Sequence, residues 1–225
     1  MRAPRLLRAL AAVLFGLVCA APAPAAAPTS ALAEALQRKY ASVRDFSASF
    51  VHTYRGGVLN KTLREQGRVL IRKPGMMRWE YRAPDTKLFV SDGVSVYAYV
   101  PADRQVTVSA VPPTSEASTP ALFLAGKGEL MKDFVASDAP VPAGSVAGAR
   151  ALKLVPRVPQ ANYDWLLLVV DGTSLTLRGL VTTDAQGGVS SFTFSDLKEN
   201  VGLTPGQFTF TVPRGVEVIQ DGHAR

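Results

Sequence analysis

The side chains best suited to chemistry are few and scattered in this sequence. His52 and His223 are the only histidines, and neither has a second potential ligand at a spacing that metal sites use. Neither Gly-x-Ser-x-Gly nor Gly-x-x-x-x-Gly-Lys occurs, so the motifs of a serine nucleophile and of a phosphate loop are missing. Acids such as Asp92 and Asp184 stand beside glycine or at strand ends, where turn chemistry explains them. We expect neither an enzyme nor a cofactor or metal site.

The single cysteine, Cys19, belongs to a predicted export signal. The first ten residues, "MRAPRLLRAL", hold three arginines and no acid, and an apolar run too short to span a bilayer follows. An Ala-x-Ala site then predicts a signal peptide over residues 1–25 and one domain over residues 26–225. Cys19 follows Val18 rather than the small residue that lipid attachment requires, so we expect it to be discarded with the signal. The mature protein is expected to be soluble and periplasmic.

The charge of the mature chain excludes one class of partner. Without the three arginines of the signal, 22 basic residues remain against 18 acidic ones, a formal charge of +4. The basic residues are spread along predicted strands and do not interleave with aromatic residues as in nucleic-acid-binding surfaces. We expect no nucleic-acid partner.

Short strands with alternating side chains dominate the predicted structure. In "MMRWEYRA" three apolar residues, Met77, Trp79 and Tyr81, alternate with charged ones, which is typical of a half-buried strand. A helix is expected from Thr29 or Ser30 to about Val43. The rest divides into about eleven short strands separated by turn signals, including a last strand at "QFTFTVP". This pattern is mainly β with some α and favours a single antiparallel barrel or sandwich.

The predicted inner face carries unusually bulky and adaptable residues. Periodicity alone favours an ordinary filled core, but Phe, Met and Trp also suit a lining that fits variable apolar cargo. Other aromatic residues expected on this face are Phe192, Phe194, Phe208 and Phe210. The candidate lining residues are Phe46, Phe50, Val69, Ile71, Met77, Trp79, Tyr81 and Phe89.

A helical insertion interrupts the strands between residues 112 and 137. "STPALFLAGKGELMKDFVAS" predicts one or two short helices, with Pro120 at a first helical position. The segment is too apolar for a surface connection, so it covers something: either a fixed plug of one barrel end or a movable lid. Its candidate covering residues are Leu122, Phe123, Leu124, Met131 and Phe134.

In their order and spacing, these segments resemble the LolA family of periplasmic lipoprotein carriers. The similarity covers nearly the whole mature chain, through "FSASF", "KPGMMRW", "SDGVSVYAYVP", "TPALFLAG" and "NVGLTPGQFTFTVPRGVEV". It implies an unclosed antiparallel β-barrel of about eleven strands, with an N-terminal helix and a helical lid over an apolar cavity for acyl chains. It also implies acylated lipoproteins as cargo, an inner-membrane ABC lipoprotein-releasing complex as donor, an outer-membrane lipoprotein as acceptor, and a monomer.

One position departs from the family pattern. Well-studied members carry an arginine immediately before the proline of the "KPG" motif, and it hydrogen-bonds backbone carbonyls of the lid. Here the residue is Lys73, which lacks the planar fork of arginine. The resemblance makes Lys73 the candidate lid latch, and plain solvation of Lys73 and Arg72 is the alternative.

Two other functions stay open on the same fold, because fold does not decide cargo. One is a carrier of another acylated lipid or a glycolipid. The other is a lipid-sensing regulatory protein, a class that usually has an additional domain, which we do not expect after the residues "VEVIQDGHAR".

Overall fold

The computed structural model describes residues 30–56, 61–111, 120–127, 129–184 and 186–220. The predicted signal peptide, Cys19 and His223 lie outside this range. Three α-helices are described: α1 (Ala31–Ser42), α2 (Pro120–Leu124) and α3 (Leu130–Asp133), with two 3₁₀ turns, η1 (Pro101–Asp103) and η2 (Pro205–Phe208). The strands are β1 (Asp45–Arg55), β2 (Thr62–Arg72), β3 (Met76–Ala83), β4 (Lys87–Asp92), β5 (Ser95–Val100), β6 (Gln105–Ala110), β7 (Phe134–Ala139), β8 (Ala149–Pro156), β9 (Leu166–Asp171), β10 (Leu177–Thr183), β11 (Val189–Glu199) and β12 (Glu217–Gln220).

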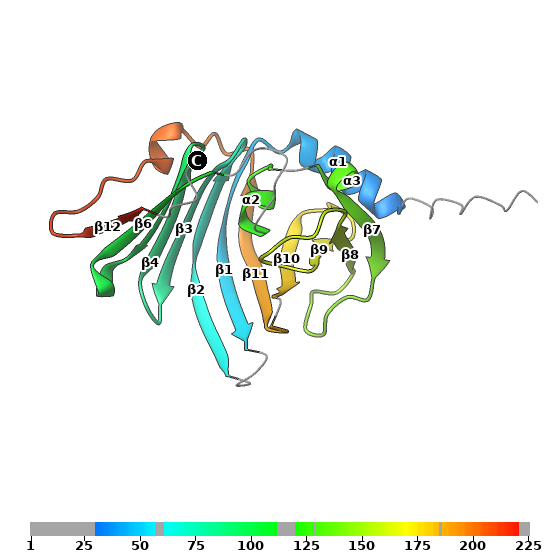
Figure 1. Cartoon of the computed structure of the whole chain (residues 1–225). Coiled ribbons are helices and arrows are strands. Elements are labelled where there is room, and N and C mark those ends of the chain that lie inside the picture. The colour runs from blue at the N-terminus through cyan, green and yellow to red at the C-terminus, as the bar shows by residue number, and fades with distance from the viewer. Residues whose placement is uncertain (1–29, 57–60, 112–119, 128, 185, 221–225) are drawn as a thin grey trace, which may run out of the picture.

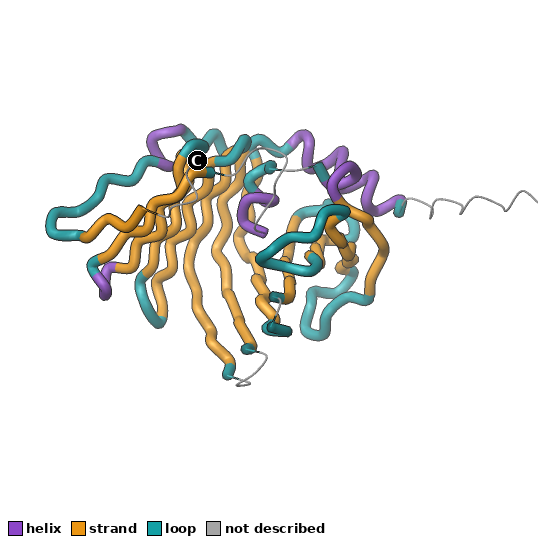
Figure 2. The backbone as a smooth tube through the Cα atoms, viewed as in Figure 1, coloured by secondary structure: helices purple, strands orange, loops and turns teal. Residues whose placement is uncertain are grey.

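All of these strands form one sheet that curls without closing. Their order is β12-β6-β5-β4-β3-β2-β1-β11-β10-β9-β8-β7, so β12 and β7 are its two edges. Every pairing is antiparallel except that of β12 with β6, which is parallel. Figures 1 and 2 show the sheet curving around α2, with α1 across its upper end. The expected unclosed antiparallel barrel is confirmed.

The alternation along each strand gives the sheet an apolar inner face. In register, Phe50 of β1 lies opposite Gly67 of β2, and Trp79 of β3 lies between Val69 of β2 and Phe89 of β4. Residues two apart point to the same side of a strand, so the apolar positions of neighbouring strands form one continuous surface. The main buried cluster of the protein lies on this face and extends to α1, α2 and α3.

Helix α1 begins and ends close to the residues expected. The side chain of Ser30 caps it by accepting a hydrogen bond from the Ala33 backbone nitrogen at 3.3 Å. Its apolar stripe, with Leu32 and Leu36, is buried in the main cluster. The Ser30 hydroxyl also donates to Asp138 of β7 at 2.5 Å. The helix therefore connects one edge of the sheet to the start of β1.

The expected last strand at "QFTFTVP" is wrong. Residues 205–208 form η2, and the chain that follows has no ladder partner until β12. Phe208 is buried with Leu70 and Leu203 in a second cluster, on the outer face of β2. The ring of Phe210 lies 5.4 Å from that of Tyr97, also on the outer side. An odd-even pattern of apolar residues does not by itself specify a hydrogen-bonding partner. The segment "QFTFTVP" has that pattern but crosses the outer face of the sheet without joining it.

Gly67 makes room for the aromatic inner face. A Cβ at this position would lie 2.0 Å from the carbonyl oxygen of Glu80 and 2.8 Å from Cζ of Phe50. The register between β2 and β3 also shifts between Gln66 and Gly67, which is typical of a bulge. The absent side chain therefore lets the Phe50 ring lie over β2.

We predict that Gly67→Ala destabilises the protein by about 1–3 kcal/mol, because the added methyl group must displace backbone or the Phe50 ring. Urea unfolding of both proteins measures the change. Gly206→Ala is the matched control, since a Cβ there meets nothing within 4 Å. Equal loss of stability in the two variants would contradict the role given to Gly67.

Candidate functional site

The residues expected to line a cavity come together on the inner face. Phe50 is the centre of this group: its ring centroid lies 5.2 Å from that of Trp79, 4.9 Å from Tyr81 and 5.9 Å from Phe192, each edge-on. Phe89 is only partly buried and packs against the same cluster. The others are buried: Phe46, Phe50, Val69, Ile71, Met77, Trp79 and Tyr81. In this conformation they pack against one another and against the helices.

Trp79 brings an unusual polar atom into this apolar wall. Its side chain is 4% exposed, and its Nε1 has no hydrogen-bond partner among the described residues. A buried donor without an acceptor costs free energy that an apolar side chain would not. Trp79 therefore fits an environment with an acceptor better than this closed one.

Helix α2, the predicted lid, packs against the inner face. Phe123 and Leu124 are buried in the main cluster. The Phe123 ring stacks on Tyr40 of α1 at 6.4 Å and meets Phe134 edge-on at 5.2 Å. The Tyr40 hydroxyl donates to the carbonyl oxygen of Leu124 at 3.4 Å, a long hydrogen bond. These few contacts close α2 against α1.

The other predicted lid residues have different positions. Met131 lies on α3 and is partly buried against the main cluster. The placement of Phe134 in a helix is wrong, because it is the first residue of β7, although it is buried against Phe123. The sequence did not predict where this helix ends, because no glycine or proline stands between α3 and β7. Leu122 belongs to α2, and its side chain lies outside the described residues.

The end of the lid is tied to the turn between β2 and β3. The Gly75 backbone nitrogen donates to the carbonyl oxygen of Ala125 at 2.8 Å. Gly126 follows with φ of 81°, and a Cβ there would lie 2.9 Å from the side-chain carbons of Lys73. A glycine is therefore needed beside Lys73 both for backbone conformation and for space.

Lys73 itself bonds to α1. Its Nζ donates to the carbonyl oxygen of Tyr40 at 2.5 Å and lies 3.7 Å from the centre of the Tyr40 ring. Tyr40 is in the last turn of α1, where cations are favoured. The lid touches the carbon stem of Lys73 through Gly126, while the charge goes to α1. A pocket of 130 Å³ lies between these elements, lined in part by Leu36, Phe123 and Leu130.

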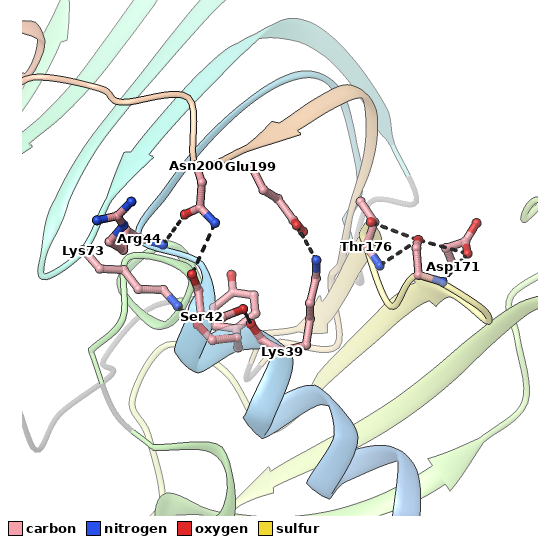
Figure 3. A network of polar contacts seen from close by, with 10 residues as sticks. Lys39, Ser42, Arg44, Lys73, Asp171, Thr176, Glu199 and Asn200 are labelled. Atoms are coloured by element: carbon pink, nitrogen blue, oxygen red, sulfur yellow. Dashed lines mark hydrogen bonds and ion pairs between the residues drawn. The ribbon is translucent and has the colours of Figure 1, made fainter.

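The junction of α1, β1 and β11 is held by a polar network that the sequence did not reveal (Figure 3). Lys39 pairs with Glu199 at the end of β11. Asn200 has a positive φ of 54°, accepts from the Arg44 backbone nitrogen at 2.8 Å and donates to the Ser42 carbonyl at 3.2 Å. The only sequence signal was the asparagine itself, which tolerates this backbone conformation.

A second polar network interrupts the inner face at its opposite end. His52 Nδ1 lies 3.1 Å from Glu65 Oε2, and its Nε2 lies 2.7 Å from Ser190 Oγ. Lys87 Nζ donates to Glu65 Oε1 at 2.6 Å. Burial lowers the pKa of His52, an effect that the hydrogen bond with Glu65 opposes. Sequence reasoning treated His52 alone, yet the signal was present as polar residues at inward-facing strand positions.

The comparisons with known proteins agree with this geometry. The family profile described as outer membrane lipoprotein carrier protein LolA matches residues 41–211. The chain belongs to the LolA family. An outer-membrane lipoprotein carrier protein of Chromohalobacter salexigens is 30% identical over 94% of this chain and 97% of its own length. The protein of the same name from Chromobacterium violaceum is 32% identical, over 92% of this chain and 97% of that protein.

A solved structure supports the fold of this LolA-family chain. An uncharacterized conserved protein from Thermus thermophilus has a TM-score of 0.50 at 15% identity, and the match covers 84% of this chain and 97% of that one. Among the helices in the described ranges, none combines the length and apolar character needed to cross a bilayer.

We predict a pH dependence of stability that originates at Lys73. Burial lowers its pKa from 10.5 to about 8, with Glu199 opposing the shift. Between these two values the unfolded chain binds more protons at this residue than the folded one, so its contribution makes the free energy of unfolding rise with pH. Lys73→Met removes this contribution, and urea unfolding across the window measures the difference.

Lys61→Met is the control, because Lys61 is exposed. Its stability should follow the wild type at every pH. A constant difference between wild type and Lys73→Met across the window would show that Lys73 is not desolvated in the folded protein.

Proposed function

We propose that this protein is a periplasmic carrier that binds the acyl chains of lipoproteins and delivers them to the outer membrane. The observation that carries the proposal is an apolar inner face against which α1, α2 and α3 pack, in a chain of the LolA family. The relatives named above are themselves outer-membrane lipoprotein carrier proteins. The N-terminal residues 1–25 serve as the cleaved signal that exports it.

The need for such a carrier follows from the hydrophobic effect. Each methylene of an acyl chain costs about 0.8 kcal/mol to expose to water, so a lipoprotein with several chains does not cross an aqueous compartment unaided. A carrier must cover the chains and still release them. An affinity difference of about 1.4 kcal/mol between successive binders shifts the equilibrium tenfold.

In this proposal α2 competes with the cargo for the inner face. When α2 is closed, Phe123 and Leu124 occupy the surface that acyl chains would contact. Opening disrupts the packing on Tyr40 and the hydrogen bond between Gly75 and Ala125. The cargo must supply that free energy, so the lid lowers the net affinity. Lys73 acts as a latch through α1, by holding Tyr40 in position against Phe123.

The proposed partners follow from the same role. Cargo is received from an inner-membrane ABC lipoprotein-releasing complex and passed to an outer-membrane acceptor lipoprotein, and the carrier acts as a monomer. Depletion of the protein in its host tests this directly. Outer-membrane lipoproteins should then accumulate at the inner membrane, as fractionation would measure. Correct sorting after depletion would overturn the proposed function.

We predict that Leu124→Glu lowers the amount of acylated lipoprotein that co-purifies from the periplasm by at least about tenfold. A charge facing the acyl chains costs more than about 1.4 kcal/mol in an apolar site. Mass spectrometry of the purified protein measures the cargo, and circular dichroism checks that the sheet is folded.

The matched control is Lys132→Glu, which adds the same acid to an exposed position of the neighbouring helix α3. It should retain its cargo. A folded Leu124→Glu protein with undiminished cargo would contradict the role of the lid. Free lipid in place of acylated protein, in the wild type, would instead identify a carrier of another lipid.

A further inference from the structure

On β1 and β2, the run of buried apolar residues along the inner face ends at a defined place. From the end next to α1, the inward-facing residues of this strand are Phe46, Ala48 and Phe50, all buried. The next inward residue is His52, which begins the polar network with Glu65 of β2, Lys87 of β4 and Ser190 of β11. We call these four residues the polar stop.

The polar stop is centred on a buried carboxylate that is internally satisfied, and its Lys87 side chain is 28% exposed. The side chain of Glu65 is 4% exposed and that of His52 is 13% exposed. Both carboxylate oxygens of Glu65 have a partner, and the ammonium of Lys87 balances its charge. The ring of His52 also stacks on Phe192 at 4.2 Å, with an interplanar angle of 5°. Separating these groups would leave a buried charge unpaired, which is strongly unfavourable.

An acyl chain therefore cannot displace this cluster as it can displace the lid. The methyl terminus of an acyl chain cannot donate a hydrogen bond to a buried carboxylate. Its insertion between Glu65 and Lys87 would break their hydrogen bond. Beyond Phe50, a chain that continues along β1 meets the ring of His52 and then Tyr54, whose hydroxyl donates to Asp184.

We propose that the polar stop ends the acyl-chain site and sets the longest chain that binds with full contact. This inference rests on the proposed function and adds a specificity to it. Cargo enters at the end where α2, Lys73 and the start of β1 meet, and the chain runs along the strands toward His52.

The distance along β1 from Phe46 to His52 gives an expected length for the bound acyl chain. Phe46 and His52 are six residues apart in a continuous strand, which corresponds to about 20 Å at about 3.3 Å per residue. A zigzag chain of single bonds of about 1.5 Å advances by about 1.3 Å per carbon. The site therefore fits a saturated chain of about 16 carbons.

The test is a binding series with methyl esters of saturated fatty acids, which are uncharged and differ only in length. Dissociation constants of the purified full protein are measured by calorimetry. In the wild type, affinity should rise by about fourfold for each added methylene and stop rising near 16 carbons. The variant His52→Leu/Glu65→Leu/Lys87→Leu removes the polar stop, and its affinity should continue to rise with longer chains.

Replacing a complete buried ion pair by apolar residues is often neutral or stabilising, and thermal unfolding checks that this variant folds. The matched control is Arg78→Leu/Glu80→Leu/Arg82→Leu, which removes an ion-paired triad from the opposite face of β3. It should keep the wild-type limit. The wild-type series is itself a test that needs no variant.

Three outcomes would overturn the inference. Affinity that keeps rising beyond about 16 carbons in the wild type would show that nothing ends the site there. An unchanged limit in the folded triple-leucine variant would show that other residues set it. Absence of binding at every length would overturn the proposed function itself, and the length limit with it.

Discussion

The structure depends on one constraint: a single open sheet has an apolar face that no second sheet covers. In a sandwich, two inner faces bury each other, but here all twelve described strands belong to one sheet. Curling lets the face cover part of itself, and α1, α2, α3 and Tyr163 of the β8–β9 loop pack against it. The proposed function requires that cargo can replace α2, which contributes one short helix to that cover.

The contacts that hold α2 bear on whether the proposed exchange of α2 for cargo can be reversible. Among the described residues, apolar packing of Phe123 and Leu124 is joined by a backbone hydrogen bond from Gly75 to Ala125 and by a long hydrogen bond from Tyr40 to Leu124. The start of β1, at the same end of the sheet, is held differently. There Asp45 accepts hydrogen bonds from the backbone nitrogens of residues 201 and 202, at 2.7 and 3.1 Å, and is 5% exposed. The proposed opening of α2 would break the contacts of the helix and leave these bonds at Asp45 in place.

The sequence predicted most strands of the sheet, because alternating apolar and polar residues indicate a strand with one buried face. Met77, Trp79 and Tyr81 were assigned to the inner side on this basis, and they lie there. Alternation does not report pairing, which is why Phe208 and Phe210 were assigned to a strand and to the wrong face. Phe134 was placed in a helix because β7 begins without a glycine or proline before it. The polar stop was missed for another reason: His52, Glu65 and Lys87 come from three strands, and only the register brings them together.

The two ends of the inner face differ in a way that gives the site a direction. At the α1 end, Lys73 directs its ammonium to Tyr40 and its carbon stem toward Gly126, and this is the boundary that moves in the proposed function. At the other end, the charges of Glu65 and Lys87 face each other inside the sheet, so the boundary is fixed by the cost of separating them. In the proposed binding mode, a chain that enters beneath α2 gains apolar burial with each methylene until it reaches that boundary. The net binding free energy is then the difference between the gain from buried methylenes and the loss of the packing of α2 on opening. This difference can be small even though each of the two terms is large.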